Sequence, residues 1–451
     1  MGIKRARIVG AGLAGSEAAW QLAQRGWSVE LWEMRPAIQT PAHTTGDAAE
    51  LVCSNSFRGN EITQAPGVLK RELERAESMI MRAAHRARIP AGSAFAVDRQ
   101  HLSQEVESAL AACPTLERRH GRIERIDDDI PTILATGPLT AEPLARWLAQ
   151  ITGTLHLAFY DAIAPILDRS SLDESAGWWG NRRDPDGHDY FNIPLDRPQY
   201  EAFVSELQRA ERVAYESFET DIVHFEGCLP IEVMADRGLE TLRFGPMKAV
   251  GLDDPRTGRW PHAVVQLRQE NAAASMLNFV GFQTKMKHAE QVRVLRTLPG
   301  LAQAEFVRLG SMHRNTFVRS PQVLDARLRL RARPAVWIAG QLSGVEGYVE
   351  STASGLMAAL SLHEGEFFEL PPATTAIGSL LRYITDPRVT QFQPMNTNFG
   401  LFAPLTDPKQ IRAQGRARKQ HYGERALRDF EAWAKGRNLA PWGGAETETT
   451  R

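Results

Sequence analysis

Two cysteines stand in segments that could present a thiol for chemistry. Cys53 lies in the polar stretch ELVCSNS, and Cys228 follows a glycine in HFEGCLPIE, two residues before a proline that marks a turn. A thiolate is a strong nucleophile, and a nearby arginine or helix N-terminus favours that form. A free cysteine is also commonly a small buried hydrophobe. The residues alone therefore leave both thiols open, either as reactive groups or as structural side chains.

The third cysteine, Cys113, sits at the expected end of a helix in ALAACPTL and is interpreted as structural. Three cysteines without regular spacing argue against a disulfide framework and for a reducing compartment. The N-terminal MGIKRARIVG has no apolar region or cleavage site of a secretory signal. The longest apolar runs fall far short of the ~20 residues that a membrane span needs. We therefore expect a cytoplasmic protein with no membrane partner and no metal.

A glycine-rich turn near the N-terminus predicts a dinucleotide site. The pattern GAGLAG follows the strand-like ARIV and precedes the helix-forming SEAAWQLAQRG, which is the context that the motif requires. The first glycine permits the tight turn, the second lets a pyrophosphate approach the backbone, and the third lets helix and strand pack closely. The helix N-terminus then offers free N–H groups to the phosphates. The residues predicted to bind the cofactor at this turn are Gly10, Gly12, Leu13, Ala14 and Gly15.

One further residue supports the dinucleotide site, and two further segments indicate that the dinucleotide is FAD. Glu33 ends the next strand, WSVELWEM, and is predicted to accept hydrogen bonds from the adenosine ribose. The late segment VWIAGQLSGVEG has a second strand and glycine turn ahead of a helix that begins near Glu350. Two-part flavoproteins use such a segment to set a helix N-terminus against the flavin, and the mid-chain ILATG is typical of them. We predict that Gly340, Glu346 and Gly347 also bind the cofactor.

These elements require an α/β fold. A chain of 451 residues is too long for one ordinary core, so two or three domains are expected. The pattern predicts a Rossmann-like FAD-binding domain of the two-part flavoprotein type, discontinuous over 1–140 and 334–451. Residues 141–333 mix helices and strands with turn-rich breaks, and they are predicted to form an inserted α+β domain. The stretch GVLKRELERAESMIMRAAHRARIP is predicted to be one long helix that ends at Pro90.

Short segments spread in order over nearly the whole chain match one family. They are GAGLAGSEAAW, EMRP with TPAHTT, ELVCSNS, RIPAGSAFAVDR, ILATGPLT, FEGCLPIE, RFGPMKAVGLDDPRTG, AVVQLRQE, NFVGFQTKMKHAEQ, GSMHRNT, GVEGYVES and FQPMNTNFG. In these segments the chain resembles the bacterial folate- and FAD-dependent tRNA uridine-54 methyltransferases. RFGPMKAVGL and MHRNT have no generic structural reason to recur, which makes the resemblance specific. One stretch departs from the family: within 177–196, Ile193-Pro194 stands where relatives carry a Cys-Pro in a shorter segment.

The resemblance implies a methyl transfer to C5 of uridine 54 in the tRNA T-loop. The carbon donor would be 5,10-methylenetetrahydrofolate and the reductant reduced FAD. NADPH or NADH would recharge the flavin transiently, since the sequence has a single G-x-G-x-x-G motif. By the same resemblance, Cys228 aligns with the thiol that attacks uracil C6, and Cys53 with the flavin-side thiol proposed as the base. His313 matches a position that stacks on the folate, and Asn315 is predicted to bind the folate with it.

The resemblance also makes tRNA the expected partner, with the inserted domain binding it. The target uridine is stacked in a folded loop, so the base must be flipped out or the loop opened. Lys285 and Lys287 are predicted to contact phosphates, as are Arg416, Arg418 and Lys419 in the C-terminal run KQIRAQGRARKQHYGERALR. That run has seven Lys and Arg against one acid, although a solvated helix face is the alternative interpretation. The net charge of -1 gives no hint of nucleic acid, so any basic surface must be local.

Three alternative functions stay open. An FAD-dependent thiol oxidoreductase would be supported by a C-x-x-C motif, and none occurs. A flavoprotein subunit that helps modify the tRNA wobble uridine shares the glycine turn but lacks the pair ELVCSNS and FEGCLP. A non-catalytic, FAD-stabilised RNA-binding scaffold would need neither Cys53 nor Cys228.

Overall fold

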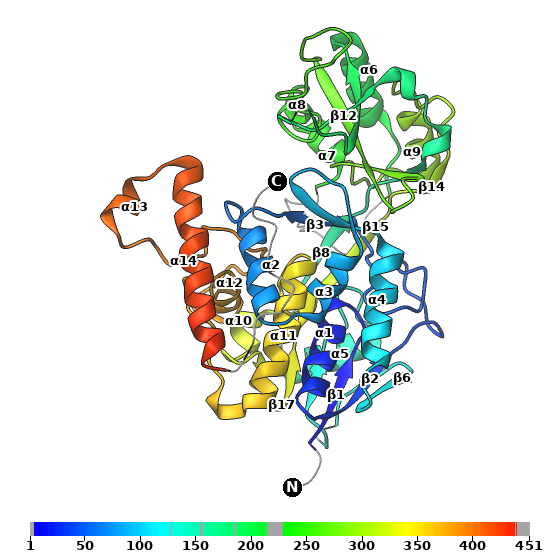
Figure 1. The fold of residues 1–451 in the computed structure, drawn as a ribbon. Coiled ribbons are helices and arrows are strands. Elements are labelled where there is room, and N and C mark those ends of the chain that lie inside the picture. Colours follow the sequence, from blue (N-terminus) through cyan, green and yellow to red (C-terminus); the bar gives the residue numbers. More distant parts are fainter. Residues whose placement is uncertain are drawn as a thin grey trace.

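The chain folds into two bodies, with the middle of the sequence set apart from both ends (Figure 1). This is a computed structural model. The middle segment, mainly green in Figure 1, forms the second body, whereas the blue, yellow and red segments share the first body. The described residues are 4–127, 129–153, 157–184, 186–213, 229–437 and 439, with the backbone alone described at 157–161 and 312–314.

The first body is built on a six-stranded sheet in the order β16-β17-β7-β1-β2-β6. Five of its strands are parallel to their neighbours, and β16 is antiparallel to β17 at one edge. The strands are β1 (Arg5–Val9), β2 (Ser28–Glu33), β6 (Leu116–His120), β7 (Thr132–Leu134), β16 (Arg329–Leu330) and β17 (Arg333–Ile338).

The two ends of the chain meet at the centre of this sheet. Val9 in β1 pairs with Leu134 in β7, which in turn pairs with Ile338 in β17. Helix α1 (Leu13–Gln24) follows the glycine turn, and α11 (Tyr348–Glu364) packs across it. Gly355 of α11 allows this close approach, because a Cβ there would lie 2.2 Å from the carbonyl oxygen of Ala14. The predicted α/β class with a Rossmann-like unit is confirmed.

The first body also contains further helices and a small sheet. The helices are α2 (Ala65–Arg75), α3 (Met79–Arg86), α4 (Arg99–Ala111), α5 (Glu142–Thr152), α10 (Ser320–Val323), α12 (Ala376–Thr385), α13 (Pro408–Arg412) and α14 (Gly415–Lys435). The three-stranded sheet has the order β3-β5-β4, with β3 (Ser56–Gly59), β4 (Arg88–Ile89) and β5 (Ala94–Val97). Among the described residues, no helix combines the length and the apolar character needed to cross a membrane.

The prediction of a single long helix before Pro90 is wrong, because the helical conformation is interrupted between α2 and α3. Glu77 has a φ of 56°, in the left-handed region that interrupts a helix. Ser78 then starts α3 as its N-cap, and its hydroxyl oxygen accepts the N–H of Met81. The buried carboxylate of Glu17 accepts hydrogen bonds from the Ser78 hydroxyl at 2.8 Å and from the Ile80 N–H at 2.9 Å. A distant acid therefore fixes this helix start, which local helix propensity does not reveal.

The second body is built on an antiparallel sheet in the order β10-β11-β12-β13-β9-β14. Its strands are β9 (Ile166–Asp168), β10 (Trp178–Trp179), β11 (Tyr190–Leu195), β12 (Ala263–Gln269), β13 (Met276–Phe279) and β14 (Phe306–Arg308). Its helices are α6 (Arg197–Arg209), α7 (Ile231–Asp236), α8 (Thr241–Phe244) and α9 (His288–Leu295). The ladder of β8 (Leu157–Ala162) with β15 (Met312–Phe317) carries the chain between the bodies.

The two hydrophobic cores suggest where the inserted domain begins and ends. The core of the second body runs from Leu167 to Ala304. Leu144 on α5 and Phe317 on β15 belong instead to the core of the first body. We propose that the inserted domain is narrower than 141–333 and spans about 166–308.

The divergent segment 177–196 fastens the second body to the first. It supplies the edge strands β10 and β11, and Tyr190 donates its hydroxyl hydrogen to the carbonyl oxygen of Ala91 at 2.9 Å. The Asp189 carboxylate accepts the N–H of Gly92 at 2.5 Å. Ile193, which stands where the resemblance leads us to expect a cysteine, is fully buried in the core of the second body. A residue at this position is placed for packing and does not border either cavity described below.

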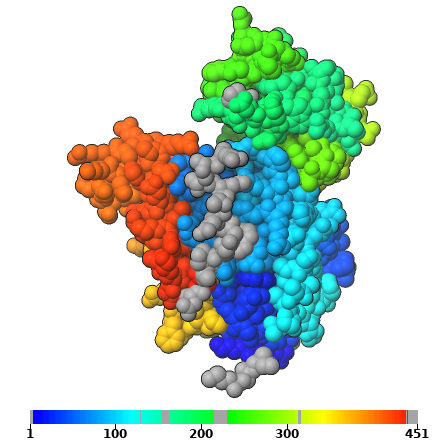
Figure 2. Space-filling view, in the orientation of Figure 1, coloured from blue at the N-terminus to red at the C-terminus, as the bar shows by residue number. Residues whose placement is uncertain are grey.

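The C-terminal helices α13 and α14 form an arm beside the first body. Figure 2 shows an open hollow between this orange and red arm and the green second body. Helix α14 packs closely on the segment before α2, where a Cβ at Gly423 would lie 2.5 Å from the carbonyl oxygen of Ile62. The basic residues of the arm therefore stand on a firmly attached helix.

Candidate active site

The glycine turn forms one wall of a cavity at the carboxyl ends of the parallel strands. Gly10 has a φ of 99°, and a Cβ there would lie 2.5 Å from the carbonyl oxygen of Ala135. A Cβ at Gly15 would lie 1.8 Å from the carbonyl oxygen of Gly10. Gly12, the N-cap of α1, differs because no other atom lies within 4 Å of its Cβ position. Gly10 and Gly15 therefore make the turn possible, whereas Gly12 leaves space in front of it.

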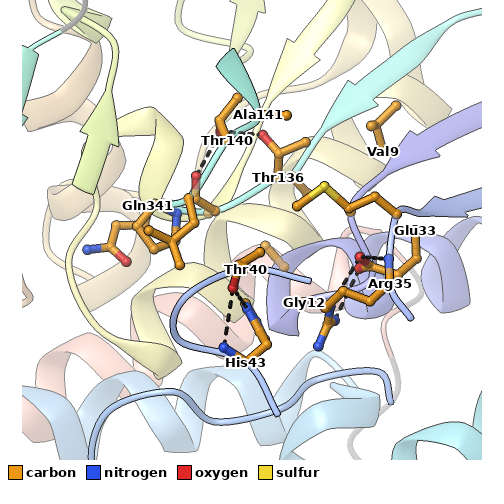
Figure 3. A pocket seen from close by; sticks show the side chains of 18 of the residues that line it. Val9, Gly12, Glu33, Arg35, Thr40, His43, Thr136, Thr140, Ala141 and Gln341 are labelled. Carbon is orange, nitrogen blue, oxygen red and sulfur yellow. Dashed lines mark hydrogen bonds and ion pairs between the residues drawn. The ribbon is translucent and has the colours of Figure 1, made fainter. Parts of the chain in front are cut away.

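This first cavity encloses about 1020 Å³, counted out to its mouth. Figure 3 shows side chains from the N-terminal segment and from the segment after β7 converging on it, together with Gln341. Residues from both ends of the chain therefore line one site. The lining includes Gly10, Gly12, Leu13, Ala14, Glu33, Arg35, Thr40, His43, Thr136, Gly340 and Tyr348.

A buried acid–arginine pair holds the turn in place. One carboxylate oxygen of Glu33 accepts the N–H of Ala11 at 3.0 Å, and the other accepts both the backbone N–H and the Nε–H of Arg35 at 3.0 and 3.1 Å. Burial alone would raise the pKa of Glu33, but the hydrogen bonds and charge of Arg35 outweigh it and lower that pKa. Glu33 is therefore an anion that orients the glycine turn as well as lining the cavity.

The loop after β2 is organised by a second acid. The Glu50 carboxylate accepts the backbone N–H and hydroxyl of Thr44, both at 2.8 Å, and those of Thr45 at 3.1 and 2.8 Å. Burial would raise the pKa of Glu50, but these hydrogen bonds lower it below its usual range. Thr40 and His43, whose Oγ1 and Nδ1 lie 2.6 Å apart, are thereby set at the cavity edge.

A second cavity of about 1350 Å³, counted out to its mouth, continues from the first. The two share lining residues, so they form one connected space. Cys53 lies on one side of the second cavity, and Phe279 and Gly281 of the second body lie on another. The residues common to both cavities are Val52, Pro138, Leu139, Gln341, Tyr348 and Ser351.

The backbone around Cys53 is held from several directions. The Cys53 N–H donates to the Tyr348 hydroxyl oxygen at 2.8 Å. The Arg99 guanidinium donates to the carbonyl oxygens of Leu51 and Cys53, each at 2.5 Å, and pairs with Glu270. Burial would lower the pKa of Arg99, but the charge of Glu270 raises it, so the group is a fixed cation. The half-buried thiol is thus presented to the cavity by a rigid loop.

Asn55 ties the same loop to the second body. Its amide nitrogen donates to the carbonyl oxygens of Val97 and Glu270 at 3.1 and 3.2 Å. Its carbonyl oxygen accepts from Arg268 at 2.7 Å and from Asn278 at 3.2 Å. The Asn55 side chain is fully buried, so these contacts fix the loop at the junction of the two bodies.

The other end of the loop rests on a buried lysine. Lys70 donates from Nζ to the carbonyl oxygens of Phe57, Gly59 and Pro66 at 2.9, 2.8 and 3.0 Å. Burial lowers the pKa of Lys70 to about 7. Arg58, between the first two of these carbonyl groups, has a φ of 63° and lines the second cavity. Its guanidinium lies 3.3 Å from the buried carboxylate of Glu350 on α11.

Most residues that are predicted to bind the cofactor line one of the two cavities, and their role stays a prediction. Gly10, Gly12, Leu13, Ala14, Glu33 and Gly340 line the first cavity. Cys53, Asn315, Glu346 and Gly347 line the second cavity. Gly15 borders neither cavity among the described residues, because it packs behind Gly10. Gly347 is the N-cap of α11, so the start of this long helix faces the second cavity.

Two predicted residues of the reaction cannot be placed by their side chains. Cys228 lies outside the described residues. The described chain resumes at Leu229, and the N–H of Ile231 donates to the carbonyl oxygen of Gln283, which lines the second cavity. His313 has a described backbone, which pairs with Asp161 in the ladder of β15 with β8. The roles of Cys228 and His313 stay predictions.

The predicted phosphate contacts fall into three groups. Lys287 lies 2.7 Å from Glu211, and Arg416 lies 2.9 Å from Glu61, so a phosphate would compete with an acid at both. Lys285 is partly buried, and burial lowers its pKa. The remaining two, Arg418 and Lys419, are exposed on α14, and no acid partner is found for them among the described residues.

Known proteins resemble this chain over almost its full length. The family model of glucose inhibited division protein A matches residues 5–365. The methylenetetrahydrofolate–tRNA-(uracil-5-)-methyltransferase TrmFO of Rhizorhabdus wittichii is 52% identical over 96% of this chain and 99% of that protein. The TrmFO of Moorella thermoacetica is 53% identical over 88% of this chain and 92% of that protein. The chain belongs to the TrmFO family. GidA of Aquifex aeolicus shares the fold, with a TM-score of 0.69 at 14% identity over 97% of this chain and 74% of that one.

The segments that resemble the TrmFO family converge on the two cavities. RIPAGSAFAVDR ends at Arg99, AVVQLRQE contains Arg268 and Glu270, and GVEGYVES contains Tyr348. None of these four residues was predicted to belong to the site, although each lies in a matched segment. The resemblance itself was the available signal, since nothing in the local pattern indicates that Arg99 contacts the backbone of Cys53.

Proposed function

We propose that this protein methylates C5 of a uracil in tRNA, and that the target is uridine 54 of the T-loop. Methylenetetrahydrofolate is the proposed carbon donor. The observation that supports this most directly is the connected pair of cavities, one behind a dinucleotide-type turn and one beside the thiol of Cys53. The TrmFO relatives, whose names state this activity for them, supply the substrate class.

The first cavity fits FAD. The open space in front of Gly12 and the free N–H groups at the start of α1 suit a pyrophosphate. Glu33 is an anion that lines the cavity, and a ribose hydroxyl would take the place of one of its four hydrogen bonds from Ala11 and Arg35. Gly340 and the N-terminus of α11 at Gly347 would lie beside the flavin. Bound reduced FAD would supply the hydride that turns the transferred methylene into a methyl group, with NADPH or NADH as the proposed source of electrons.

The residues of the second cavity have defined tasks in this proposal. The thiolate of Cys228 adds to uracil C6, which makes C5 nucleophilic toward the methylene carbon of the folate. Cys53 accepts the proton that leaves C5 as the bond from the methylene carbon to the folate nitrogen breaks and tetrahydrofolate departs. Addition of a hydride to that methylene carbon then expels the Cys228 thiolate from C6, which restores the pyrimidine and completes the methyl group. Arg99 and Tyr348 hold the Cys53 backbone. His313 and Asn315 are proposed to bind the folate.

The deciding experiment uses an unmodified tRNA transcript with methylenetetrahydrofolate and NADPH or NADH. We expect 5-methyluridine at position 54, and none in a transcript that carries cytidine there. Absence of 5-methyluridine with the intact protein would refute the proposed function. Methylation at another uridine would refute the assignment to position 54.

The roles of Cys228 and Cys53 can be distinguished by trapping a covalent adduct between the protein and the tRNA. In a transcript with 5-fluorouridine at position 54, the fluorine on C5 cannot leave as a proton. The reaction therefore stops at the covalent adduct, which accumulates. We expect the adduct with Cys53→Ala and not with Cys228→Ala. Cys113→Ala is the matched control, because that thiol is buried in the first core and should be dispensable for adduct formation. An adduct formed by Cys228→Ala would overturn the nucleophile assignment.

A further inference from the structure

One segment of the second body carries exposed aromatic side chains that neither cavity uses. Phe244, at the end of α8, is 79% exposed, and Trp260 is 56% exposed. Both stand in the stretch RFGPMKAVGLDDPRTGRW, which the resemblance singles out and which lacks a role in the reaction described above. Single exposed hydrophobic residues are ordinary, but two large rings on one short segment call for a ligand.

The backbone under these rings is firmly built. Arg243 donates from Nε to the carbonyl oxygen of His262 at 3.0 Å, which joins the part that bears Phe244 to the part that bears Trp260. Arg182 donates to the carbonyl oxygens of Lys248 at 2.8 Å and of Val250. The exposed rings are therefore presented by fixed turns.

The segment adjoins the second cavity. Pro246 packs against Gly281, where a Cβ would lie 2.7 Å from the proline Cβ. Gly281 itself lines the second cavity. Met247 accepts the backbone N–H of Val264 at 3.1 Å, so the turn is also joined to β12 in the sheet. A polymer whose one base enters the cavity would thus meet this segment with its neighbouring nucleotides.

The charges of the segment suit a polyanion. Its acid Asp254 is paired with Arg256, Glu240 just before the segment is paired with Arg243, and Asp253 is an exposed acid without such a pair among the described residues. Two exposed cations of the segment, Lys248 and Arg259, have no acid partner among the described residues. The same holds for the exposed Arg183, whose backbone N–H donates to the carbonyl oxygen of Gly251 at 2.9 Å.

We propose that Phe244, Trp260, Arg183, Lys248 and Arg259, called here the aromatic–basic surface, bind the unpaired nucleotides that flank the target uridine. Bases stack on aromatic rings without regard to sequence, and the exposed cations of these neighbouring turns would bind the phosphates. A base pair in a duplex has no face free for such stacking, so the surface favours a loop that has opened. This inference rests on the proposed function and assigns the tRNA a place on the second body.

The test measures the affinity of the full-length protein for an unmodified tRNA transcript by fluorescence anisotropy. Phe244→Ala/Trp260→Ala should weaken binding about tenfold or more, since each stacked base contributes on that scale. Lys248→Ala/Arg259→Ala should weaken it and make the salt dependence shallower by about two phosphate contacts. Phe367→Ala removes a ring that is 89% exposed on the first body, and it should leave affinity unchanged. Circular dichroism and thermal melting confirm that each variant folds.

Several outcomes would overturn the proposal. The first is a Phe244→Ala/Trp260→Ala double variant that keeps the affinity and the KM of the unaltered protein for tRNA, while the unaltered protein methylates tRNA. This result would refute tRNA binding by the aromatic–basic surface and would not contradict the proposed function. A protein that self-associates through Trp260, with tRNA affinity unaffected by its loss, would make the surface a contact between copies of the chain. An intact protein that neither binds nor methylates tRNA would remove both proposals together.

Discussion

Arg99 illustrates how a single side chain can define a reactive position. Its planar guanidinium donates to the backbone on both sides of Val52 and to Glu270. Lysine carries a compact ammonium in place of this fork, so it cannot serve three acceptors in the same arrangement. The residue positions the loop of Cys53 through these backbone contacts.

Arg99→Lys should therefore lower kcat for methyl transfer by about 10²-fold, with little change in KM for tRNA, since misplacement of about 1 Å has costs of that size. The measurement is steady-state methylation at saturating folate. Arg86→Lys is the control, because Arg86 is an exposed arginine with a similar carboxylate partner, Glu105 at 2.8 Å. Equal kcat in the two variants would contradict a positioning role for Arg99.

Lys70 should make stability depend on pH above neutrality. Its pKa is lowered from 10.5 to about 7 in the folded chain, so between these values the unfolded chain binds a proton that the folded chain has released. The free energy of unfolding then rises with pH across that window, by at most about 1.4 kcal/mol per pH unit, and Lys70 adds no slope below pH 7.

The measurement for Lys70 is urea denaturation at pH 7.5 and 9 for the intact protein and for Lys70→Met. The intact protein should gain stability relative to the variant on going to the higher pH. Parallel pH dependences would show that Lys70 keeps its proton throughout this window. The variant is also expected to be less stable overall, because it removes the amine that donates hydrogen bonds to buried carbonyl oxygens.

At the scale of elements, short sequence patterns predict those helices, strands and turns whose conformation depends on neighbouring residues alone. The turn from Gly10 to Gly15 and the strand ending at Glu33 were predictable because their spacing within one β–α–β unit is the motif itself. The break at Glu77 was not, because Glu17 supplies the acceptor from another helix. Asn55 and its partners on β12 and β13 are more than 200 residues apart, and no periodicity reports such a contact.

The glycine turn provides a matched pair of substitutions. Gly15→Ala should destabilise the protein by about 1–3 kcal/mol or more, because its Cβ would overlap the carbonyl oxygen of Gly10. Gly12→Ala should fold normally, since its φ of -70° suits alanine and no atom lies within 4 Å of the Cβ. It should nevertheless bind FAD more weakly, because the methyl group occupies space in front of the helix N-terminus.

Thermal melting of the FAD-free protein and titration with FAD, followed by flavin fluorescence, separate these two effects. Gly12→Ala should resemble the unaltered chain in melting and differ in the titration. Full FAD affinity in Gly12→Ala would place the pyrophosphate elsewhere. A normal melting curve for Gly15→Ala would show that α1 can shift on β1 at little cost.

At the scale of the whole molecule, the arm of α13 and α14 stands across an open hollow from the second body (Figure 2). Arg418→Glu/Lys419→Glu should weaken tRNA binding, with the largest effect at low salt, if the arm contacts phosphates. Lys435→Glu reverses a charge at the other end of α14, where Lys435 pairs with Glu431 at 3.1 Å, and should have no effect. Filter binding at two salt concentrations decides between this contact and a merely solvated helix face.

The division into two bodies was also predictable, but its details were not. Chain length and the two glycine turns implied a discontinuous first domain. The contribution of α5 and β15 to the first core depends on packing between distant segments, which composition does not encode. The sequence of the stretch 177–196 predicts no role for it. In the structure, the Tyr190 hydroxyl donates a hydrogen bond to the carbonyl oxygen of Ala91 across the junction of the two bodies.

The central pairing of β7 with β17 has a consequence for synthesis on the ribosome. When β7 emerges, its partner on that side is still about 200 residues from being made, and α1 lacks the helix that will cover it. At ~5–20 residues per second, that edge stays open for roughly 10–40 s. The second body, whose strands all lie within this interval, can fold first as an independent unit. The nascent N-terminal half therefore exposes an unpaired strand edge until β17 is made, and we expect a chain truncated before residue 333 to be prone to aggregation.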